Sequence, residues 1–535
     1  MPDSDAAEDS AAAAAGGRRR VLATLSAILF LTFLDTTIVA VALADVQSRL
    51  HAGVADLQWV VNGYALTFAG LMLGMGTLGD RLGRKRVMLG GLGVFIAGSL
   101  FGALASSVSL LIAARVVMGV GAAASEPGTL SLIRHVYPER AQRARALGIW
   151  AAVAGLALAM GPVVGGVLVG LGTWRAVFWF NLGAGLVALL AAAATVPESA
   201  DRQASRIDLP GFVLGPVALG AAIFAVIHGE TTGYRAPSVV ALFVLAAATG
   251  VAFIVVEQRS RAPIFDHRYL LRAPFTGVLT VAFAAYFGIF SIFFFTALYL
   301  QVVVGYSAYR TAALFVPMAI AMIAASALTG RWVAHTGPRL PIVLGCLAAG
   351  LGMLATDAAL RGHVSAVTLA PALALAGLGF GVAVVPATSV ALAEVPAAHS
   401  GMAAGATTTA RELGSVVGVA VLGSLVNGHL TVDLAHRLAA LGVPPGFRSV
   451  VITAVETGQA PRGGSGVASA EQAFGPIVAH VVEAAYGAFR DGLSISLVVA
   501  GGVILGAGVI AWVALAGHRP GVEHDATEDR PADAA

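Results

Sequence analysis

Charged residues are scarce in this sequence, and their scarcity excludes several classes of protein. Only 11% of the 535 residues are Asp, Glu, Lys or Arg, whereas 58% are hydrophobic, and the mean hydropathy is +0.85. A soluble globular chain carries roughly 25% charged residues, so an ordinary soluble domain is excluded. The net charge of +3 is too small to indicate a nucleic-acid-binding surface, and we expect no nucleic-acid partner.

Cysteine and lysine are nearly absent as well. Cys346 is the only cysteine, which excludes an intramolecular disulfide, and its apolar run predicts a packing role. Lys85 is the only lysine, and because no Gly-Lys pair exists the chain has no P-loop for ATP hydrolysis. The sequence has no HExxH motif, no cluster of His and Cys ligands and no carboxylate pair at a catalytic spacing. It therefore predicts no metal, no cofactor and no enzymatic activity.

Long apolar runs are what the sequence has in abundance. A helix that spans a membrane needs about 20 apolar residues, and we count fourteen such segments. The first resembles a secretory signal, but it is long, contains Asp35 and precedes thirteen more, so we expect an uncleaved helix. The predicted fold class is an all-α polytopic membrane protein. The predicted spans begin near Val21, Leu57, Val87, Leu110, Ala144, Trp174, Gly211, Pro237, Ala273, Tyr309, Pro341, Ala366, Gly401 and Gly492.

Arginine and lysine in the loops predict the orientation. With the N-terminus in the cytoplasm, the cytoplasmic loops and tails carry 21 Arg and Lys residues, whereas the short outside loops carry five. Cytoplasmic loops of membrane proteins carry the excess of positive charge, so both termini are predicted to be cytoplasmic. We expect a monomeric, multi-pass protein of the bacterial inner (cytoplasmic) membrane, surrounded by the lipid bilayer.

An internal repeat predicts two similar halves. Gly76 and Gly83 are seven residues apart in the turn after the second span, and Gly330 and Gly337 are seven apart in the turn after the tenth. Duplicated halves around a central cavity are the architecture of many secondary transporters. The predicted organisation is a disordered cytoplasmic tail (1–17), an N-terminal six-helix bundle (18–196), two linker transmembrane helices (197–258), a C-terminal six-helix bundle (259–517) with a long outside loop (427–491), and a disordered cytoplasmic tail (518–535).

Six stretches, in order along the chain, resemble one family. The stretch "GTLGDRLGRKRVML" (76–89) matches the loop signature of the major facilitator superfamily. The stretch "LDTTIVAVAL" (34–43) resembles the first-helix motif of one branch of it, the fourteen-span drug:proton antiporters. The stretch "RVVMGVGAAA" (115–124) resembles the fourth-helix motif of the family, and "AMGPVVGG" (159–166) resembles its antiporter motif. The stretches "WRAVFWFNLGAG" and "ARELGSVVGVAVLG" are typical of the same branch. The resemblance implies two pseudo-symmetric six-helix bundles with two extra central helices.

The charged turn at 76–89 is predicted to be both an anchor and a gate. Its cations suit a cytoplasmic membrane edge, and its glycines allow a tight turn between antiparallel helices. The resemblance implies a charge-linked latch that breaks when the two halves rock. The predicted gating residues are Gly76, Asp80, Arg81, Gly83 and Arg84.

Asp35 and Arg115 are the candidates for proton coupling. An ionisable residue inside a span costs about 2.5–3.5 kcal/mol, and Asp35 lies near the middle of the first span. Desolvation favours the neutral form of a carboxyl group, so Asp35 is suited to load and release a proton, which the resemblance also implies. Arg115 supplies a permanent counter-charge. The alternatives are a carboxylate that only bonds to Thr36, Thr37 or a neighbouring helix, and an arginine that snorkels to the outer face.

Other ionisable and aromatic residues are candidates for the walls of a substrate cavity. Glu126 precedes Pro127, which loosens the fourth span, although a solvated position near its cytoplasmic end is an equal alternative. Glu412 adds a negative charge that favours cationic substrates, and its neighbour Arg411 points about 100° away on a helix. Aromatic residues in spans are more often helix packing than a binding surface. The candidates are Glu126, Arg411, Glu412, Trp59, Tyr64 and Phe290.

The antiporter motif lies in the fifth predicted span. Gly161, Pro162, Gly165 and Gly166 make a bendable face that packs closely on a neighbouring helix. Helix packing alone explains such a stretch, whereas the resemblance implies antiport.

The sequence predicts a proton-coupled secondary exporter of lipophilic, cationic drugs or of an endogenous antibiotic. Its expected partners are the small-molecule substrate and protons, and its expected mechanism is alternating access. A transporter of an anionic metabolite on the same fold, with Arg115 and Arg411 as anion sites, is the alternative. A membrane enzyme or a channel is a less favoured alternative of another class.

Overall fold

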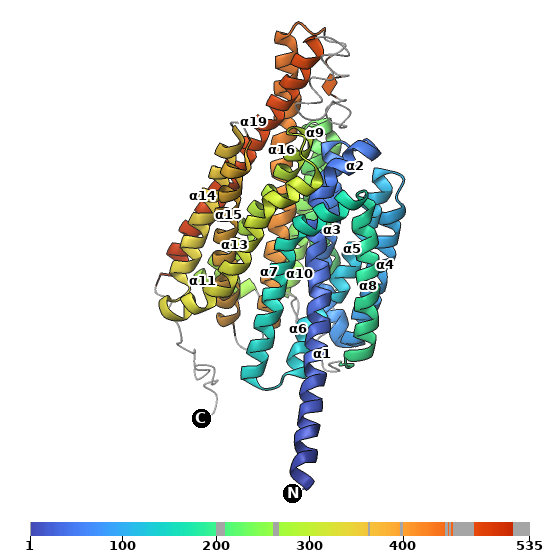
Figure 1. The fold of residues 1–535 in the computed structure, drawn as a ribbon, viewed down its shortest axis with the longest axis vertical. Helices are drawn as coiled ribbons and strands as arrows, with labels where there is room; N and C mark the ends of the chain where they lie inside the picture. The colour runs from blue at the N-terminus through green and yellow to red at the C-terminus, as the bar shows by residue number, and fades with distance from the viewer. Residues whose placement is uncertain are drawn as a thin grey trace.

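The computed structural model describes residues 2–199, 209–259, 267–361, 364–395, 400–444, 448, 451–452 and 476–516. In these residues the regular structure is helical, without a strand (Figure 1). The first helices are α1 (Pro2–Ile38), η1 (Val39–Ala42), α2 (Leu43–Leu50), α3 (Val54–Leu82), α4 (Arg84–Leu104), α5 (Val108–Ser125), α6 (Pro127–Val136), α7 (Arg140–Leu171) and α8 (Arg175–Thr195). The next are α9 (Leu209–Thr232), α10 (Pro237–Arg259), η2 (His267–Leu271), α11 (Ala273–Ser291), the π-helical η3 (Ile292–Thr296) and α12 (Ala297–Val302). The last are α13 (Ala308–Thr336), α14 (Arg339–Arg361), α15 (Ala366–Ala393), α16 (Ser400–Ala440) and α19 (Pro476–Ala514).

Membrane-length helices account for most of the chain. Thirteen helical stretches of the described residues are long and apolar enough to cross a membrane. The 29-residue α3 packs among them as a fourteenth long helix. The predicted all-α polytopic fold class is therefore confirmed.

Two glycines of the internal repeat have the backbone geometry that the turns require. Gly83 ends α3 with φ 108°, and Gly337 ends α13 with φ 75°. Both values lie in the region that residues with a β-carbon rarely adopt. The main-chain N–H of each glycine still donates to a carbonyl of the preceding helix, at Gly79 and Val333. The seven-residue glycine spacing thus marks two equivalent sharp turns, one in each half.

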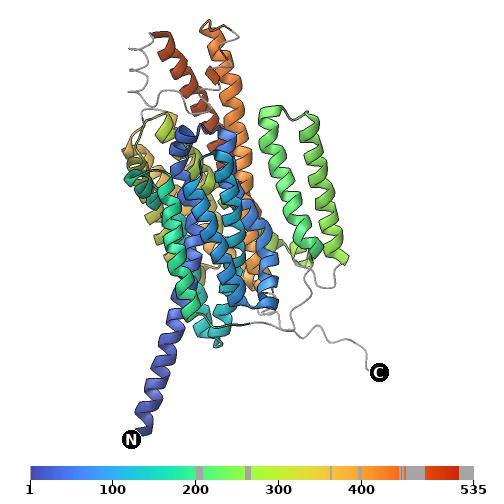
Figure 2. The same ribbon diagram turned by 90° about the vertical axis from the view of Figure 1, so that its right-hand side faces the viewer.

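The long helices form two bundles and a separate pair. The first bundle contains α1 and α3–α8, and the second contains α11–α16 and α19. Figure 2 shows α9 and α10 as an antiparallel pair at one side of the molecule, where α9 packs on α3 and α16. We call the side on which α1 begins and α19 ends the terminal side, and the opposite one the distal side (Figure 1).

Close helix contacts join the bundles towards the distal side. The helix pairs α7–α13 and α3–α16 cross from one bundle to the other. A β-carbon added at Gly166 of α7 would lie 2.8 Å from the carbonyl oxygen of Ala308, at the start of α13. A β-carbon at Gly423 of α16 would lie 2.6 Å from the amide carbon of Gln58, near the start of α3. Small residues let these backbones approach.

Two segments are more helical than the sequence predicts. The expected loop 427–491 is helical at both ends, because α16 runs on to Ala440 and α19 begins at Pro476. At 41 residues α16 is about 60 Å long, so it extends past the bundle with α19 on the distal side (Figure 1). Arg437 joins the two helices, since it donates to Asp433 at 2.7 Å and to Asp491 at 2.6 Å. We call this pair the distal extension.

The expected disordered tail 1–17 differs as well. Its residues from Pro2 onward continue α1, and the alanine run in it is a strong helix former. The predicted tail 518–535 lies outside the described residues.

Candidate functional site

The charged turn between α3 and α4 is held against the end of α8. The main-chain N–H of Arg84 donates to the carbonyl of Ser199 at 2.8 Å, and its guanidinium donates to the Ser199 hydroxyl at 3.0 Å. The Glu198 carboxylate accepts a hydrogen bond from the main-chain N–H of Lys85 at 3.2 Å. A β-carbon at Gly83 would lie 2.8 Å from the same carboxylate. These contacts are all inside the first bundle.

The remaining gating candidates lie nearby but differ in surroundings. Gly76 packs beside Pro127 at the start of α6, and Arg81 is exposed. The side chain of Asp80 lies outside the described part of the structure. A latch between the two halves at this turn stays a prediction.

Asp35 and Arg115 form an ion pair in the interior of the first bundle. Both side chains are completely buried, and one guanidinium nitrogen of Arg115 donates to the Asp35 carboxylate. The Nε of Arg115 donates to the carbonyl of Val60 on α3 at 2.9 Å. Arg115 thus faces inward, not towards the outer face. The sequence pairs these residues from the cost of a charge in a span and from the family resemblance, and the structure brings them together.

Asn181 of α8 is a third member of this cluster, which the sequence patterns above do not predict. Its side-chain amide donates to the second oxygen of the Asp35 carboxylate. A signal was present, because Asn181 is the one polar side chain in the interior of α8. Such a residue inside an apolar span is expensive unless it has a polar partner. The carboxylate is thus held from α5 and α8 at once.

Tyr64 of α3 covers the arginine of the pair. The guanidinium of Arg115 lies 4.4 Å from the centre of the Tyr64 ring, a distance at which a cation is attracted to an aromatic face. The Tyr64 hydroxyl donates to the carbonyl of Thr32, one turn before Asp35 on α1, at 2.9 Å. Tyr64 therefore closes this cluster on the side of α3.

The glycines of the α7 motif pack on the stretch of α1 that follows Asp35. The Thr37 hydroxyl donates to the carbonyl of Leu158 at 3.1 Å. A β-carbon at Gly161 would lie 2.7 Å from the Thr37 Cβ, and one at Gly165 would overlap the carbonyl oxygen of Ile38. Pro162 lies inside the helix without ending it. The face of Gly161 and Gly165 thus contacts α1, while Gly166 contacts α13 of the other bundle.

A second group of charged residues lies where the bundles meet. Glu126 stands at the junction of α5 and α6, and Glu412 lies on α16; both are completely buried. The charge of Arg411 acts on both carboxylates, and the charge of Glu126 acts on Glu412. Arg411 donates to the Thr388 hydroxyl of α15. The solvated alternative for Glu126 is wrong.

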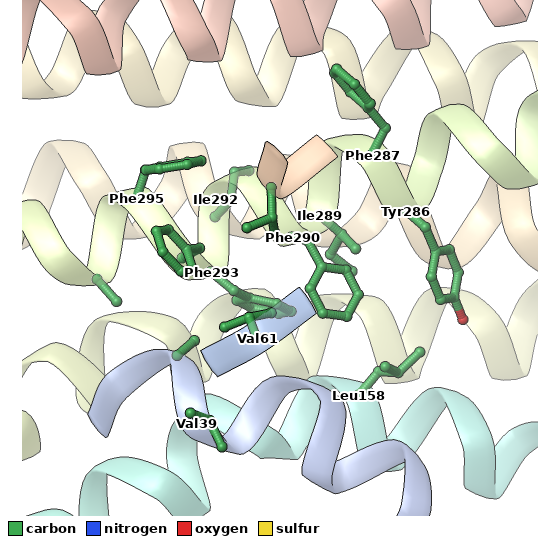
Figure 3. Packing of buried hydrophobic residues seen from close by; sticks show 14 of the residues in the cluster. Val39, Val61, Leu158, Tyr286, Phe287, Ile289, Phe290, Ile292, Phe293 and Phe295 are labelled. Atoms are coloured by element: carbon green, nitrogen blue, oxygen red, sulfur yellow. The ribbon is translucent and has the colours of Figure 1, made fainter. Parts of the chain in front are cut away.

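The aromatic candidates separate into different places. Trp59 packs on Phe224 of α9, with ring centres 5.4 Å apart, so it belongs to the contact with the linker pair. Phe290 is buried and lies 6.2 Å from Tyr286, ring centre to ring centre. In Figure 3 the ring of Phe290 points towards Val61 and Leu158 of the first bundle, whereas Phe287 and Phe295 lie on the other side of their helix. Of the three candidates, Tyr64 and Phe290 lie near the meeting of the bundles.

The distal extension has a hollow of its own. It has a volume of about 600 Å³ and is lined by residues of α16 and α19, including His429, Asp433 and His436. In the residues that the structure describes, no group of three His, Cys, Asp or Glu side chains is placed to hold a metal ion.

The family comparison decides what this two-bundle arrangement is. The profile of the Major Facilitator Superfamily matches residues 25–419, which include both charged clusters. The chain belongs to the major facilitator superfamily. It is a transporter and not an enzyme, and a multi-pass bacterial membrane protein.

Curated relatives place the chain in the drug-efflux branch of the superfamily. It is 35% identical over 434 residues to the multidrug resistance protein Stp of Mycobacterium tuberculosis, covering 81% of this chain and 80% of that protein. It is 32% identical over 505 residues to the drug efflux pump JefA of the same species, covering 92% and 97%. The puromycin resistance protein pur8 of Streptomyces alboniger is 34% identical over 422 residues, with 78% and 83% covered.

Solved structures show the same fold. The crystal structure of a bacterial homologue of the human lysosomal transporter Spinster, in an inward-facing and unoccupied conformation, aligns with a TM-score of 0.60. The alignment covers 93% of this chain and 97% of that one, at 18% identity. A bacterial homologue of human drug peptide transporters aligns with a TM-score of 0.57 at 17% identity, covering 93% and 99%.

Proposed function

We propose that this protein exports lipophilic, cationic drugs or an endogenous antibiotic in exchange for protons. The observation that carries the proposal is the buried cluster of Asp35, Arg115 and Asn181. A carboxylate so deep in a membrane protein is costly and is kept for a function. The relatives named as multidrug, puromycin and other efflux or resistance proteins support a drug as substrate.

Asp35 is the proton carrier in this proposal. When Asp35 takes up a proton, its attraction to Arg115 and Asn181 weakens, because hydrogen bonds to a charged group are stronger than those to a neutral one. Gly161 lets α7 approach α1 closely at Thr37, and after proton uptake this segment of α1 is free to shift against α7. Since Gly166 of the same helix contacts α13, a shift of α7 reaches the interface between the bundles.

The driving force of the exchange depends on the charge of the substrate. For a neutral solute, one proton that moves down a potential of 100 mV releases about 2.3 kcal/mol, which supports a concentration ratio of roughly fifty. The exchange of one proton for one monovalent cation moves no net charge, so the pH gradient alone drives it, and one pH unit supports a ratio of about ten. Both termini are cytoplasmic in this proposal, since the excess of Arg and Lys lies in the loops and tails of the terminal side.

The anionic alternative has less support in the geometry. It needs Arg115 as an anion site, but Arg115 is engaged with Asp35 and with the carbonyl of Val60. Arg411 has two buried carboxylates in its surroundings. Neither arginine offers an excess of positive charge.

Efflux of ethidium from energised cells tests the proposal. We expect cells with the wild-type protein to extrude the dye, a protonophore to stop them, and the Asp35→Asn variant to fail at equal amounts in the membrane. The Asp433→Asn variant, which alters a carboxylate of the distal extension, is the matched control and extrudes dye normally. Efflux that persists in Asp35→Asn, or that survives the protonophore, contradicts the proposal.

A further inference from the structure

Glu126 and Glu412 are buried carboxylates that lack a hydrogen-bond donor among the described residues. Neither side chain reaches solvent, and none of their four carboxylate oxygens accepts a hydrogen bond from a described residue. A buried carboxylate without a partner is among the costliest groups in a folded protein. By contrast, both oxygens of Asp35 are occupied. The four acceptor oxygens of Glu126 and Glu412 point to a ligand that carries positive charge or donates hydrogen bonds.

The two carboxylates come from opposite halves of the transporter. Glu126 is placed by Pro127, which occupies the first position of α6 and breaks the continuous helix after α5. Glu412 lies about three turns into α16, counted from the terminal side. The charge of one acts on the other. A ligand that satisfies both carboxylates therefore draws the two bundles together, whereas two bare charges keep them apart.

The charge of the group is unbalanced by one unit. Two carboxylates and the single guanidinium of Arg411 leave one excess negative charge. Among the described residues, the other titratable side chains that interact with these groups are two tyrosines, Tyr64 of α3 and Tyr286 of α11, and tyrosines are neutral near pH 7. The Asp35–Arg115 pair, which also acts on Tyr64, is balanced in itself. One proton or one monovalent cation neutralises the group.

The surroundings favour an organic cation over a metal ion. Two carboxylates are too few for a closed metal site, and the described residues hold no cluster of three ligands. Aromatic rings stand close by: the Arg411 guanidinium lies 5.6 Å from the Tyr286 ring centre, and Tyr286 packs beside Phe290. Aromatic and apolar walls around a charge suit a lipophilic cation.

We propose that Glu126 and Glu412 are the cation subsite of this transporter, which holds either one proton or the charged group of one lipophilic monocation. This inference rests on the proposed function and adds the place and the charge count of its substrate. Binding of the cation expels the proton, so proton and substrate exclude each other at one place. Asp35 then acts as a second, separate proton site.

Binding of tetraphenylphosphonium to the purified full-length protein tests the subsite directly. Titration calorimetry in buffers of different ionisation enthalpy gives the affinity and the protons released per cation. For the wild type we expect affinity to fall as the pH is lowered, with release approaching one proton per cation. Loss of a charged partner weakens binding about tenfold or more, so Glu412→Gln and Glu126→Gln each bind about tenfold more weakly and release no proton.

The net charge of the group provides a control, because a merely structural role of Glu412 predicts no recovery of binding when that charge is restored. Glu412→Gln leaves a neutral group, and the further change Arg411→Gln restores one negative charge. We expect the double variant Arg411→Gln, Glu412→Gln to regain cation affinity over Glu412→Gln, together with proton release. Glu412→Asp keeps the charge and binds, and Asp433→Asn matches the wild type. Elution as a single species and a cooperative unfolding transition confirm that each variant is folded.

The outcomes separate this inference from the proposed function. Wild-type affinity and proton release in both Glu126→Gln and Glu412→Gln overturn the subsite, as does a wild type that binds no tetraphenylphosphonium. If those variants also keep proton-driven transport in vesicles, the proposed function stands without the subsite. If binding behaves as expected but a pH gradient drives no transport in the wild type, the subsite stands and the proposed coupling falls.

Discussion

Arg115 donates a hydrogen bond to the carboxylate of Asp35 where neither side chain reaches solvent. An ion pair of this kind is weak evidence for stability, because desolvation offsets much of the attraction. Removal of one partner is different, since it leaves an uncompensated charge in the interior. Proton uptake by Asp35 neutralises only the carboxylate and leaves the guanidinium of Arg115 uncompensated, so it weakens the contact between α1 and α5.

The first prediction concerns the stability of this pair. Arg115→Ala leaves the Asp35 carboxylate without its counter-charge, and we expect a loss of about 3–5 kcal/mol in the free energy of unfolding. Adding Asp35→Asn to Arg115→Ala recovers part of that loss, because the unpaired charge is gone. Denaturant unfolding of the purified protein measures both. A double variant less stable than Arg115→Ala contradicts the ion pair.

The second prediction concerns Asn181. Its amide donates to a charged carboxylate, so Asn181→Ala costs about 1.5–3 kcal/mol of stability. Asn62 of α3 is the matched control, because it is equally buried but its amide atoms bond to no described residue. Asn62→Ala is expected to cost less. Equal losses in the two variants indicate that the bond to Asp35 contributes nothing.

The third prediction concerns the approach of α7 to α13. Gly166→Ala places a methyl group against Ala308 and Ala312 of the other bundle, and overpacking of this kind costs about 1–3 kcal/mol. We expect slower transport because the distal interface closes less well. Gly155→Ala on the same helix is the control, since no atom lies within 4 Å of its added β-carbon. Normal transport by Gly166→Ala contradicts the role of this contact.

The fourth prediction concerns orientation. Cys346 is buried, so single cysteines introduced at exposed positions can be labelled without removing it. The side chain of Arg49, on the distal side, is 51% exposed, and that of Arg86, on the terminal side, is 80% exposed. A membrane-impermeant maleimide is expected to label Arg49→Cys on intact cells and Arg86→Cys only after permeabilisation. The reverse pattern contradicts cytoplasmic termini.

The sequence predicts the fold and the first charged cluster well, because rare residues stand out in an apolar chain. Asp35 and Arg115 were found from their cost in a span, and the glycine turns from their spacing. Asn181 was missed because a single amide carries no charge. Its place beside Asp35 depends on how α8 packs against α1 and α5.

Contacts between distant segments explain what the sequence could not predict. Glu126 and Glu412 are 286 positions apart in the chain. They interact electrostatically only because the two bundles pack against each other. Trp59 looked like a cavity residue because it is aromatic and in a span, but the α9 helix covers it. The helical ends of the expected loop were missed because their polar residues lack a membrane-length apolar run.

The most direct measurement of the central claim is transport by purified protein in proteoliposomes. An imposed pH gradient is applied, and the uptake of ethidium is followed for the wild type and for Asp35→Asn. We expect uptake that depends on the gradient in the wild type and none in Asp35→Asn, with both proteins folded and inserted to the same extent. Gradient-driven uptake by Asp35→Asn at the wild-type rate would contradict Asp35 as the proton carrier.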